Sequence, residues 1–296
     1  PAWRKLIKSS LRATHRDDAP HGDEPFVSAL GGATGMWPEI DDVDGAFANE
    51  IKKGLLLKTQ KSQDVYWNQF LSWFFVQQKE YGKAFVQEKA VYKRNPDSFY
   101  NIVTLAKLAI DEKQNEEATS ILTFVLENTD NLDLQMQAHH FLVSMEIEWA
   151  LEKDYLALDL KLQGLLKKYG ITPFSLELQI LTAHFEAFYL KQTDLGKQLL
   201  QNALQLPLNI REESRVKMEL ADIMVYDEKF NQAILYYAQV EENLKNDVIA
   251  HEASFKLAKA NFYKRDFDWT LQQVKNLKQS PSLLIANDAV ELFLLI

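Results

Sequence analysis

Two adjacent histidines, His139 and His140, are the residues whose types could most readily bind a metal ion. Successive residues on a helix point about 100° apart, so the two imidazoles cannot both face one ion. The spacing is not that of a His-x-x-x-His pair, and Glu146 and Glu148 do not complete a metalloprotease pattern. We therefore predict no metal site here and place both histidines in a groove or on the surface.

The acidic stretch Asp42–Gly45 invites comparison with a calcium-binding loop. With Gly45 as the sixth residue of such a loop, the first position is Ile40 and the twelfth is Ile51. Neither residue can supply a carboxylate, so we predict no calcium site. Asp44 is better placed to cap the helix that follows.

We also predict no catalytic activity at the other polar clusters. Carboxylate pairs such as Glu116-Glu117, Glu212-Glu213 and Glu241-Glu242 fall at expected helix starts or on polar faces. The sequence has no cysteine, no phosphate-binding glycine loop and no G-x-S-x-G motif. We predict that the protein is not an enzyme, has no catalytic residues and uses no cofactor.

The composition predicts a folded, helix-rich chain: 47% of the 296 residues are hydrophobic and 25% are charged. Six of the ten glycines and four of the eight prolines fall before residue 55, so the remainder is poor in helix breakers. The net charge of -9 argues against a nucleic-acid partner. No apolar run reaches about 18 residues, so no transmembrane segment is predicted.

A small side chain recurs at similar spacing along the predicted helices. The aligned positions are Ala84, Ala118, Leu158, Gly196, Ala233 and Thr270, which are separated by 34, 40, 38, 37 and 37 residues. A small residue at this position lets two helices approach closely, and Leu158 is the exception. Such helix pairs cannot bury their apolar sides alone, so each pair must stack on its neighbours.

The period and the residue choices resemble the tetratricopeptide repeat (TPR), a unit of 34 residues in two antiparallel helices. The residues that carry the resemblance are Leu71, Ser72, Phe75, Tyr81, Ala84 and Pro96, then Leu105, Ala106, Ala109 and Ala118, then Leu220, Ala221, Met224, Phe230, Ala233 and Tyr237, and finally Leu257, Ala258, Phe267 and Thr270. The resemblance implies an all-α fold, a right-handed α-solenoid of TPR-like helix-turn-helix repeats.

Two regions are expected along the chain. Residues 1–44 form an irregular N-terminal arm and linker. The segment 1–16, which carries several basic residues, is interpreted as a loosely held arm in preference to an amphipathic helix that binds an anionic surface. Residues 45–296 form the helical array. Its units lie near 62–96, 97–130, 131–170, 171–210, 211–247 and 248–280, with a partial unit at 281–296.

In TPR proteins, certain positions of each first helix face the inner groove. The resemblance therefore implies that the partner-binding residues are Tyr66, Gln69, Trp73, Tyr100, Lys107, Tyr226, Phe255, Lys259 and Tyr263. Aromatic side chains supply the large desolvated area that anchors a peptide or an amphipathic helix. The alternative for Trp73, Tyr100 and Tyr263 is that they pack inside the array.

Residues 77–98 (QQKEYGKAFVQEKAVYKRNPDS) and 284–296 (LIANDAVELFLLI) are also similar to large repeat proteins of flavobacteria and their relatives. Those proteins resemble secreted or envelope-associated proteins, which favours a periplasmic or envelope location over the cytoplasm. The apolar run Leu292–Ile296 leads us to expect that further repeats or a partner cover this end.

These observations predict a non-catalytic protein-interaction scaffold that binds a peptide or helix of a partner in its concave groove. The alternative is a structural or assembly subunit of a larger envelope or secretion complex. In that alternative the chain associates, with itself or with another protein, through its apolar C-terminal end.

Overall fold

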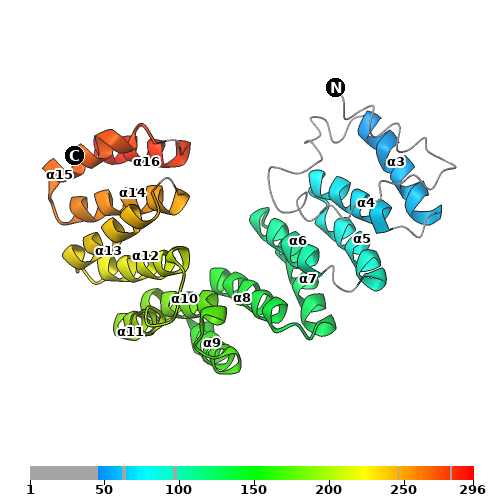
Figure 1. The fold of residues 1–296 in the computed structure, drawn as a ribbon, viewed down its shortest axis with the longest axis horizontal. Coiled ribbons are helices and arrows are strands. Elements are labelled where there is room, and N and C mark those ends of the chain that lie inside the picture. The colour runs from blue at the N-terminus through cyan, green and yellow to red at the C-terminus, as the bar shows by residue number, and fades with distance from the viewer. Residues whose placement is uncertain (1–45, 62–64, 96–98, 246, 281) are drawn as a thin grey trace. The chain divides into compact units, whose positions relative to one another are not determined.

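The computed structural model of the chain describes residues 46–61, 65–95, 99–245, 247–280 and 282–296, and the regular elements in these ranges are all helices (Figure 1). They are α3 (Ala46–Lys61), α4 (Val65–Gln77), α5 (Tyr81–Arg94), α6 (Phe99–Asp111), α7 (Asn115–Asn128), α8 (Leu132–Trp149), α9 (Tyr155–Tyr169), α10 (Leu176–His184), α11 (Thr193–Ala203), α12 (Ile210–Tyr226), α13 (Phe230–Asn243), α14 (Val248–Tyr263), α15 (Phe267–Leu277) and α16 (Leu283–Leu294). The predicted arm at 1–44 and the rejected calcium loop at Asp42–Gly45 lie outside the described residues.

Three short irregular elements accompany these helices. The 3-10 turns η2 (Glu152–Asp154) and η3 (Pro173–Ser175) precede α9 and α10, and a π-helical segment, η4 (Phe185–Tyr189), continues α10. None of the helices in the described ranges has the length and apolar character that a membrane span requires.

Consecutive helices pack against each other as pairs joined by short turns (Figure 1). The pairs include α4 with α5, α6 with α7, α12 with α13 and α14 with α15. First helices also contact first helices, because α12 packs on both α10 and α14, and α14 packs on α16. The predicted α-solenoid of TPR-like helix pairs is confirmed.

The chain divides into two compact units, residues 1–145 and 146–296, and α8 spans the division. Among the described residues of the first unit, an apolar cluster extends from Ile51 and Leu55 of α3 to Met145 of α8. In the second unit one cluster joins α10 to α14, and another joins α14, α15 and α16. The first helices and second helices each contribute to these cores, as expected for elements that cannot bury an apolar face alone.

The small residues aligned in the sequence lie at helix–helix contacts. Ala84, Ala118, Ala233 and Thr270 are fully buried. At Gly196 an added Cβ would lie 2.7 Å from the backbone oxygen of Ala183, so α11 and α10 touch backbone to backbone. The larger Leu158 is also buried.

The turns between the paired helices use a left-handed residue that is not glycine. Lys79, Lys113, Lys191, Glu228 and Arg265 have φ between 56° and 68°. The residue after each left-handed residue donates a backbone hydrogen bond to a carbonyl five or six residues earlier, for example from Lys229 N–H to Met224 O at 2.8 Å. This geometry satisfies the last carbonyls of the first helix and turns the chain into the second.

Candidate functional site

Helix α14 presents three of the predicted partner-binding residues on one side. Phe255, Lys259 and Tyr263 are spaced by four residues, so their side chains follow one another along the helix. Phe255 and Lys259 are half-buried, and Tyr263 is 46% exposed. The helix begins at a capped end, where the Asp247 carboxylate accepts a hydrogen bond from Ile249 N–H at 2.9 Å.

These three residues line a pocket of about 370 Å³ between α14 and α16. The full lining consists of Phe255, Lys259, Phe262 and Tyr263 from α14, Asp288, Glu291 and Leu292 from α16, and Leu295 directly after α16. The α16 residues follow a spacing of three and four, which places them on one stripe of that helix. Burial of Ile285 and Ala289 in the cluster with α14 and α15 turns this stripe toward the pocket.

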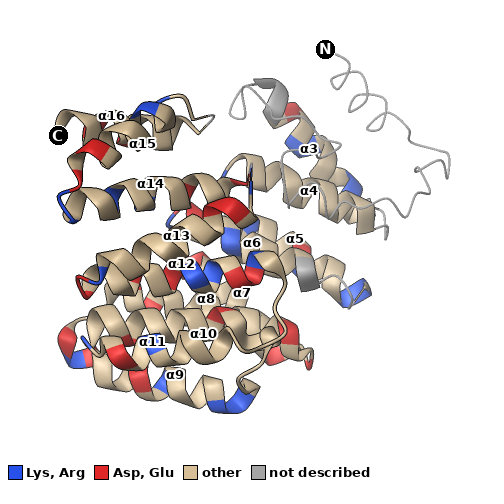
Figure 2. Cartoon of the chain, turned by 60° about the vertical axis from the view of Figure 1, so that its left-hand side comes forward, with Lys and Arg blue, Asp and Glu red and all other residues tan. Residues whose placement is uncertain are grey.

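The pocket combines aromatic walls with an excess of negative charge. Asp288 and Glu291 supply two carboxylates against the single ammonium of Lys259, whose Nζ lies 5.8 Å from the centre of the Phe255 ring. Elsewhere on the helices of the second unit, acidic and basic residues are interspersed (Figure 2). The local arrangement can therefore hold an apolar group beside a positive charge.

Neither a protein-family model nor a curated protein matches the chain. Among solved structures, the APC/C hetero-tetramer Cut9–Hcn1 matches with a TM-score of 0.53 at 16% identity, over 81% of this chain and 46% of that chain. Yeast Tom70 matches with a TM-score of 0.49 at 14% identity, over 84% of this chain and 48% of that one. The C-terminal part of a TPR repeat-containing protein of Cytophaga hutchinsonii matches with a TM-score of 0.46 at 13% identity, over 81% and 93% of the two chains. This chain thus covers less than half of the Cut9–Hcn1 chain that it matches.

The chain has the tetratricopeptide-repeat fold. The helix pairs, their buried small residues and the structural match to Cut9–Hcn1 agree on this point. The TPR register also explains why Tyr226 ends α12 as Tyr263 ends α14. Tyr226 is 50% exposed, and its ring meets Phe188 edge-on at a centroid distance of 5.2 Å.

Several polar residues at TPR groove positions already have partners inside the array. Asp222 accepts hydrogen bonds from the Tyr237 hydroxyl at 2.5 Å and from Lys256 Nζ at 2.6 Å. Burial, together with the carboxylate of Asp222, raises the pKa of the Tyr237 hydroxyl, which therefore stays protonated. Arg215 forms an ion pair with Glu177 of the preceding helix-pair repeat. These residues join neighbouring first helices.

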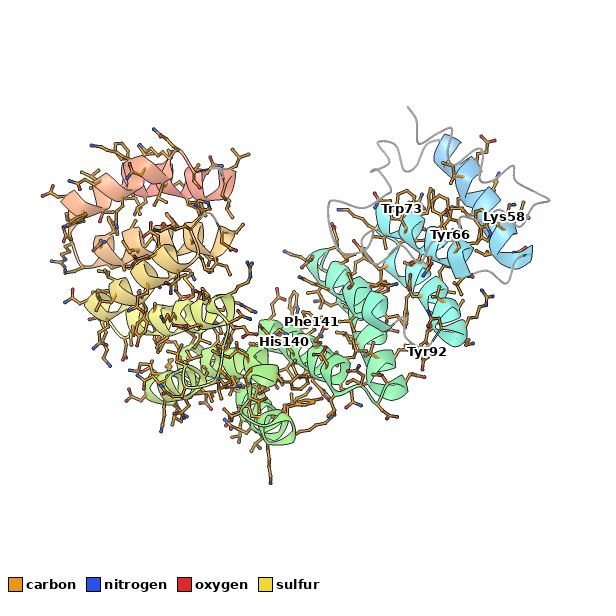
Figure 3. All side chains as sticks on the ribbon, in the orientation of Figure 1. Lys58, Tyr66, Trp73, Tyr92, His140 and Phe141 are labelled. Atoms are coloured by element: carbon orange, nitrogen blue, oxygen red, sulfur yellow. The ribbon has the colours of Figure 1, made fainter. Side chains whose placement is uncertain are left out.

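The predicted residues of the first unit have mixed positions. Trp73 lies on α4 (Figure 3). Its side chain is only 2% exposed and its ring centre lies 5.5 Å from that of Phe70, so Trp73 packs inside the array in this structure. Tyr66 is half-buried on the same helix, with its ring edge-on to Trp67 at 5.1 Å.

Gln69 is half-buried on α4, and Lys107 is exposed on α6. Tyr100 belongs to α6, but its side chain lies outside the described part of the structure. Of the predicted residues, only Phe255, Lys259 and Tyr263 line the pocket between α14 and α16.

The histidines take part in packing contacts. The His140 ring lies edge-on to Phe141 at 5.3 Å (Figure 3), and His139 is half-buried beside it. His184 Nδ1 lies 2.9 Å from Oε1 of Glu219, which belongs to the next helix-pair repeat. Within the described ranges, no group of three or more His, Cys, Asp or Glu side chains is arranged to hold a metal ion.

Proposed function

We propose that this TPR array is a non-catalytic scaffold that binds a peptide or helix of a protein partner along the groove positions of its first helices. In this proposal the pocket between α14 and α16 anchors the partner. The observation that supports it is the convergence of Phe255 and Tyr263 with Asp288 and Glu291 around one opening. The lining offers no serine, cysteine or histidine, and hence no nucleophile–histidine pair for covalent catalysis.

The pocket fits an apolar side chain that has a lysine or arginine near it. The apolar side chain would be desolvated between Phe255, Phe262 and Leu292, where buried aromatic area gives most of the binding energy. The basic side chain would meet Asp288 and Glu291 at the α16 wall, which sets specificity and the rate of association. Tyr226 and Tyr263 extend this partner-binding face toward the preceding helix-pair repeat.

Selection from a displayed peptide library tests the proposal without a known partner. Enriched peptides should contain an apolar residue next to Lys or Arg, and their binding should be lost in the double charge reversal Asp288→Lys with Glu291→Lys. The matched control is Glu242→Lys on the exposed side of α13, which should bind as the unchanged protein does. Peptides that bind all three proteins equally would exclude this pocket as the anchor.

An alternative role is that of an assembly subunit of an envelope or secretion complex, which associates through α16. Leu283 and Leu284 are 80% and 72% exposed, and Leu294 is 76% exposed. Exposed apolar area of this kind is typical of an association surface. Light scattering at increasing concentration tests it: a rising mass that Leu284→Ser with Leu294→Ser suppresses would support association. Cell fractionation would test the proposed envelope location.

A further inference from the structure

A second pocket, of about 410 Å³, lies between α9, the α10–η4 segment and α11. Its aliphatic lining consists of Leu166, Ile171, Leu195 and Leu199, and its polar lining of Gln163, Lys167, Thr182, Glu186, Gln198 and Asn202. None of these residues belongs to the α14–α16 pocket, so the two sites can be altered independently.

A buried carboxylate in this pocket lacks a full set of hydrogen bonds. Glu186 is 6% exposed, and its Oε1 accepts from Gln163 Nε2 at 3.1 Å, whereas its Oε2 is buried without a hydrogen-bond donor. The same Gln163 amide reaches Asp159 Oδ1 at 3.4 Å. Two neighbouring carboxylates therefore share one donor, which is costly for Glu186 because its carboxylate is removed from water.

The π-helical segment fixes the position of this carboxylate. Leu190 N–H donates to Phe185 O at 3.1 Å, and the rings of Phe185 and Tyr189 stack at 5.2 Å. Tyr155 of α9 meets both rings edge-on, at 5.7 and 5.5 Å. Glu186 follows Phe185 directly, so this aromatic packing holds its backbone. Single π-turns inside helices are frequent at functional sites.

We propose that this pocket binds a primary ammonium group carried on a straight alkyl chain. The ammonium donates to Glu186 Oε2, and the chain packs on Leu166 and Leu199. Burial, then the charge of Asp159, and then a side-chain hydrogen bond with Asp159 raise the pKa of the Glu186 carboxyl, and a bound cation favours the charged form against these effects. Lys167, the cationic side chain in the lining, is exposed and forms no described ion pair with Glu186.

Binding of n-butylammonium, followed by ligand-observed NMR, tests the proposal in the full chain. For a ligand of this size we expect a Kd of about 1–10 mM. Glu186→Gln keeps the shape of the side chain but removes its charge, and should weaken binding at least about tenfold. Glu148→Gln, an exposed residue of α8, is the matched control and should have no effect. Absence of binding, or equal binding by Glu186→Gln, would overturn the proposal.

A second variant does not depend on a buried residue. Leu195 lines the pocket but is 50% exposed, so Leu195→Lys should fold normally and place its own ammonium in competition with the probe. Leu235→Lys, at a 63% exposed position on α13, controls for the added charge. Loss of n-butylammonium binding in the first variant alone supports the site, and retention in both contradicts it.

Two further probes define the chemistry and its source. n-Butanol has a similar shape without charge and should bind at least about tenfold more weakly; equal binding would overturn the requirement for an ammonium. The lysine side chain of a partner and a free alkylamine both supply the proposed group. If n-butylammonium binds, the lysine analogue N-acetyl-lysine-methylamide separates the two sources. Binding of this analogue with similar affinity supports a partner's lysine as the ligand. Failure of the analogue to bind supports a free alkylamine.

Discussion

A Cβ added to Gly196 would lie 2.7 Å from the backbone oxygen of Ala183, so the backbones of α11 and α10 are in contact at these two residues. The same position lies 3.3 Å from Ala187 Cβ and 3.3 Å from Ile223 Cδ1. The first distance is shorter than real Cβ contacts, and its partner is backbone, which cannot rotate away. Glycine is therefore required by packing at this contact.

We predict that Gly196→Ala destabilises the protein, although alanine is the better helix former. Moving α11 away from α10 should cost about 1–3 kcal/mol, as overpacking of a core usually does. The matched control is Gly164→Ala, at an exposed position of α9 where the added Cβ meets nothing within 4 Å. That variant should gain about 0.5–1 kcal/mol. Urea unfolding measures both, and a stabilised Gly196→Ala would refute the contact.

Glu88 should make the first unit sensitive to pH. The side chain is fully buried on α5, and burial raises the pKa of its carboxyl to about 7 even with the Ser72 hydroxyl nearby. The unfolded chain loses this proton near pH 4.5, whereas the folded chain keeps it to about pH 7. Stability therefore falls as the pH rises through this interval, by about 3 kcal/mol, and changes little above it.

Replacement by the neutral analogue tests this prediction. Glu88→Gln should remove most of the decline and should be more stable than the unchanged protein at pH 8. Glu117→Gln, a half-buried residue of α7 in the same unit, should leave the decline in place. Thermal unfolding between pH 4.5 and pH 8 gives the comparison, and parallel curves for all three proteins would contradict the assignment to Glu88.

The left-handed turn residues carry strain that glycine would relieve. Glu228 has φ of 58° between α12 and α13, a conformation that costs a residue with a Cβ about 1 kcal/mol. Glu228→Gly should therefore raise the melting temperature by about 2–4 °C. Glu228→Ala keeps the Cβ and should not. Equal melting temperatures for the two variants would show that the charge, and not the backbone, determines stability here.

Asp227 joins two helix pairs and should contribute to stability at neutral pH. It accepts from the mostly buried Lys197 at 2.5 Å and from Lys229 at 2.8 Å, and the hydrogen bond from Lys197 is the largest of the effects that hold its pKa below the ordinary value. Asp227→Asn should cost about 2 kcal/mol at pH 7. Because the folded pKa is lowered, this contribution is present above about pH 4 and is lost as the pH falls further.

Asp194 is the internal comparison for this prediction. It contacts the same Lys197 at 2.8 Å, but its side chain is 94% exposed. Asp194→Asn should therefore have a much smaller effect, since exposed pairs are screened by solvent. A loss in Asp194→Asn equal to that in Asp227→Asn, measured by chemical denaturation at pH 7, would rule out burial as the cause.

Much of the fold could be predicted because its signals are local. Ala84, Ala118 and Ala233 recur at the repeat spacing, and each is fully buried where two helices meet. Contacts between helices adjacent in the chain decide such positions. The π-segment around Phe185 and Glu186 could not be predicted, because it depends on ring packing with Tyr155 on another helix.

The candidate site was predictable only in part for the same reason. The spacing of Phe255, Lys259 and Tyr263 places them on one side of α14, and they line one pocket. Asp288 and Glu291 were missed, because their position depends on how α16 packs on α14 and α15. The repeat register suggested groove exposure for Trp73, but a register gives the direction of a side chain and not the neighbours that cover it.

The main contacts among the described helices join neighbours and next neighbours along the chain, such as α13 with α14 and α12 with α14. Contacts of this range close only small loops, so folding can begin at several places and should be fast for a chain of this length. Unfolding of one helix pair should also remain local. Fraying of one pair, such as α4 with α5, removes that pair's interfaces and leaves the α14–α16 pocket able to form.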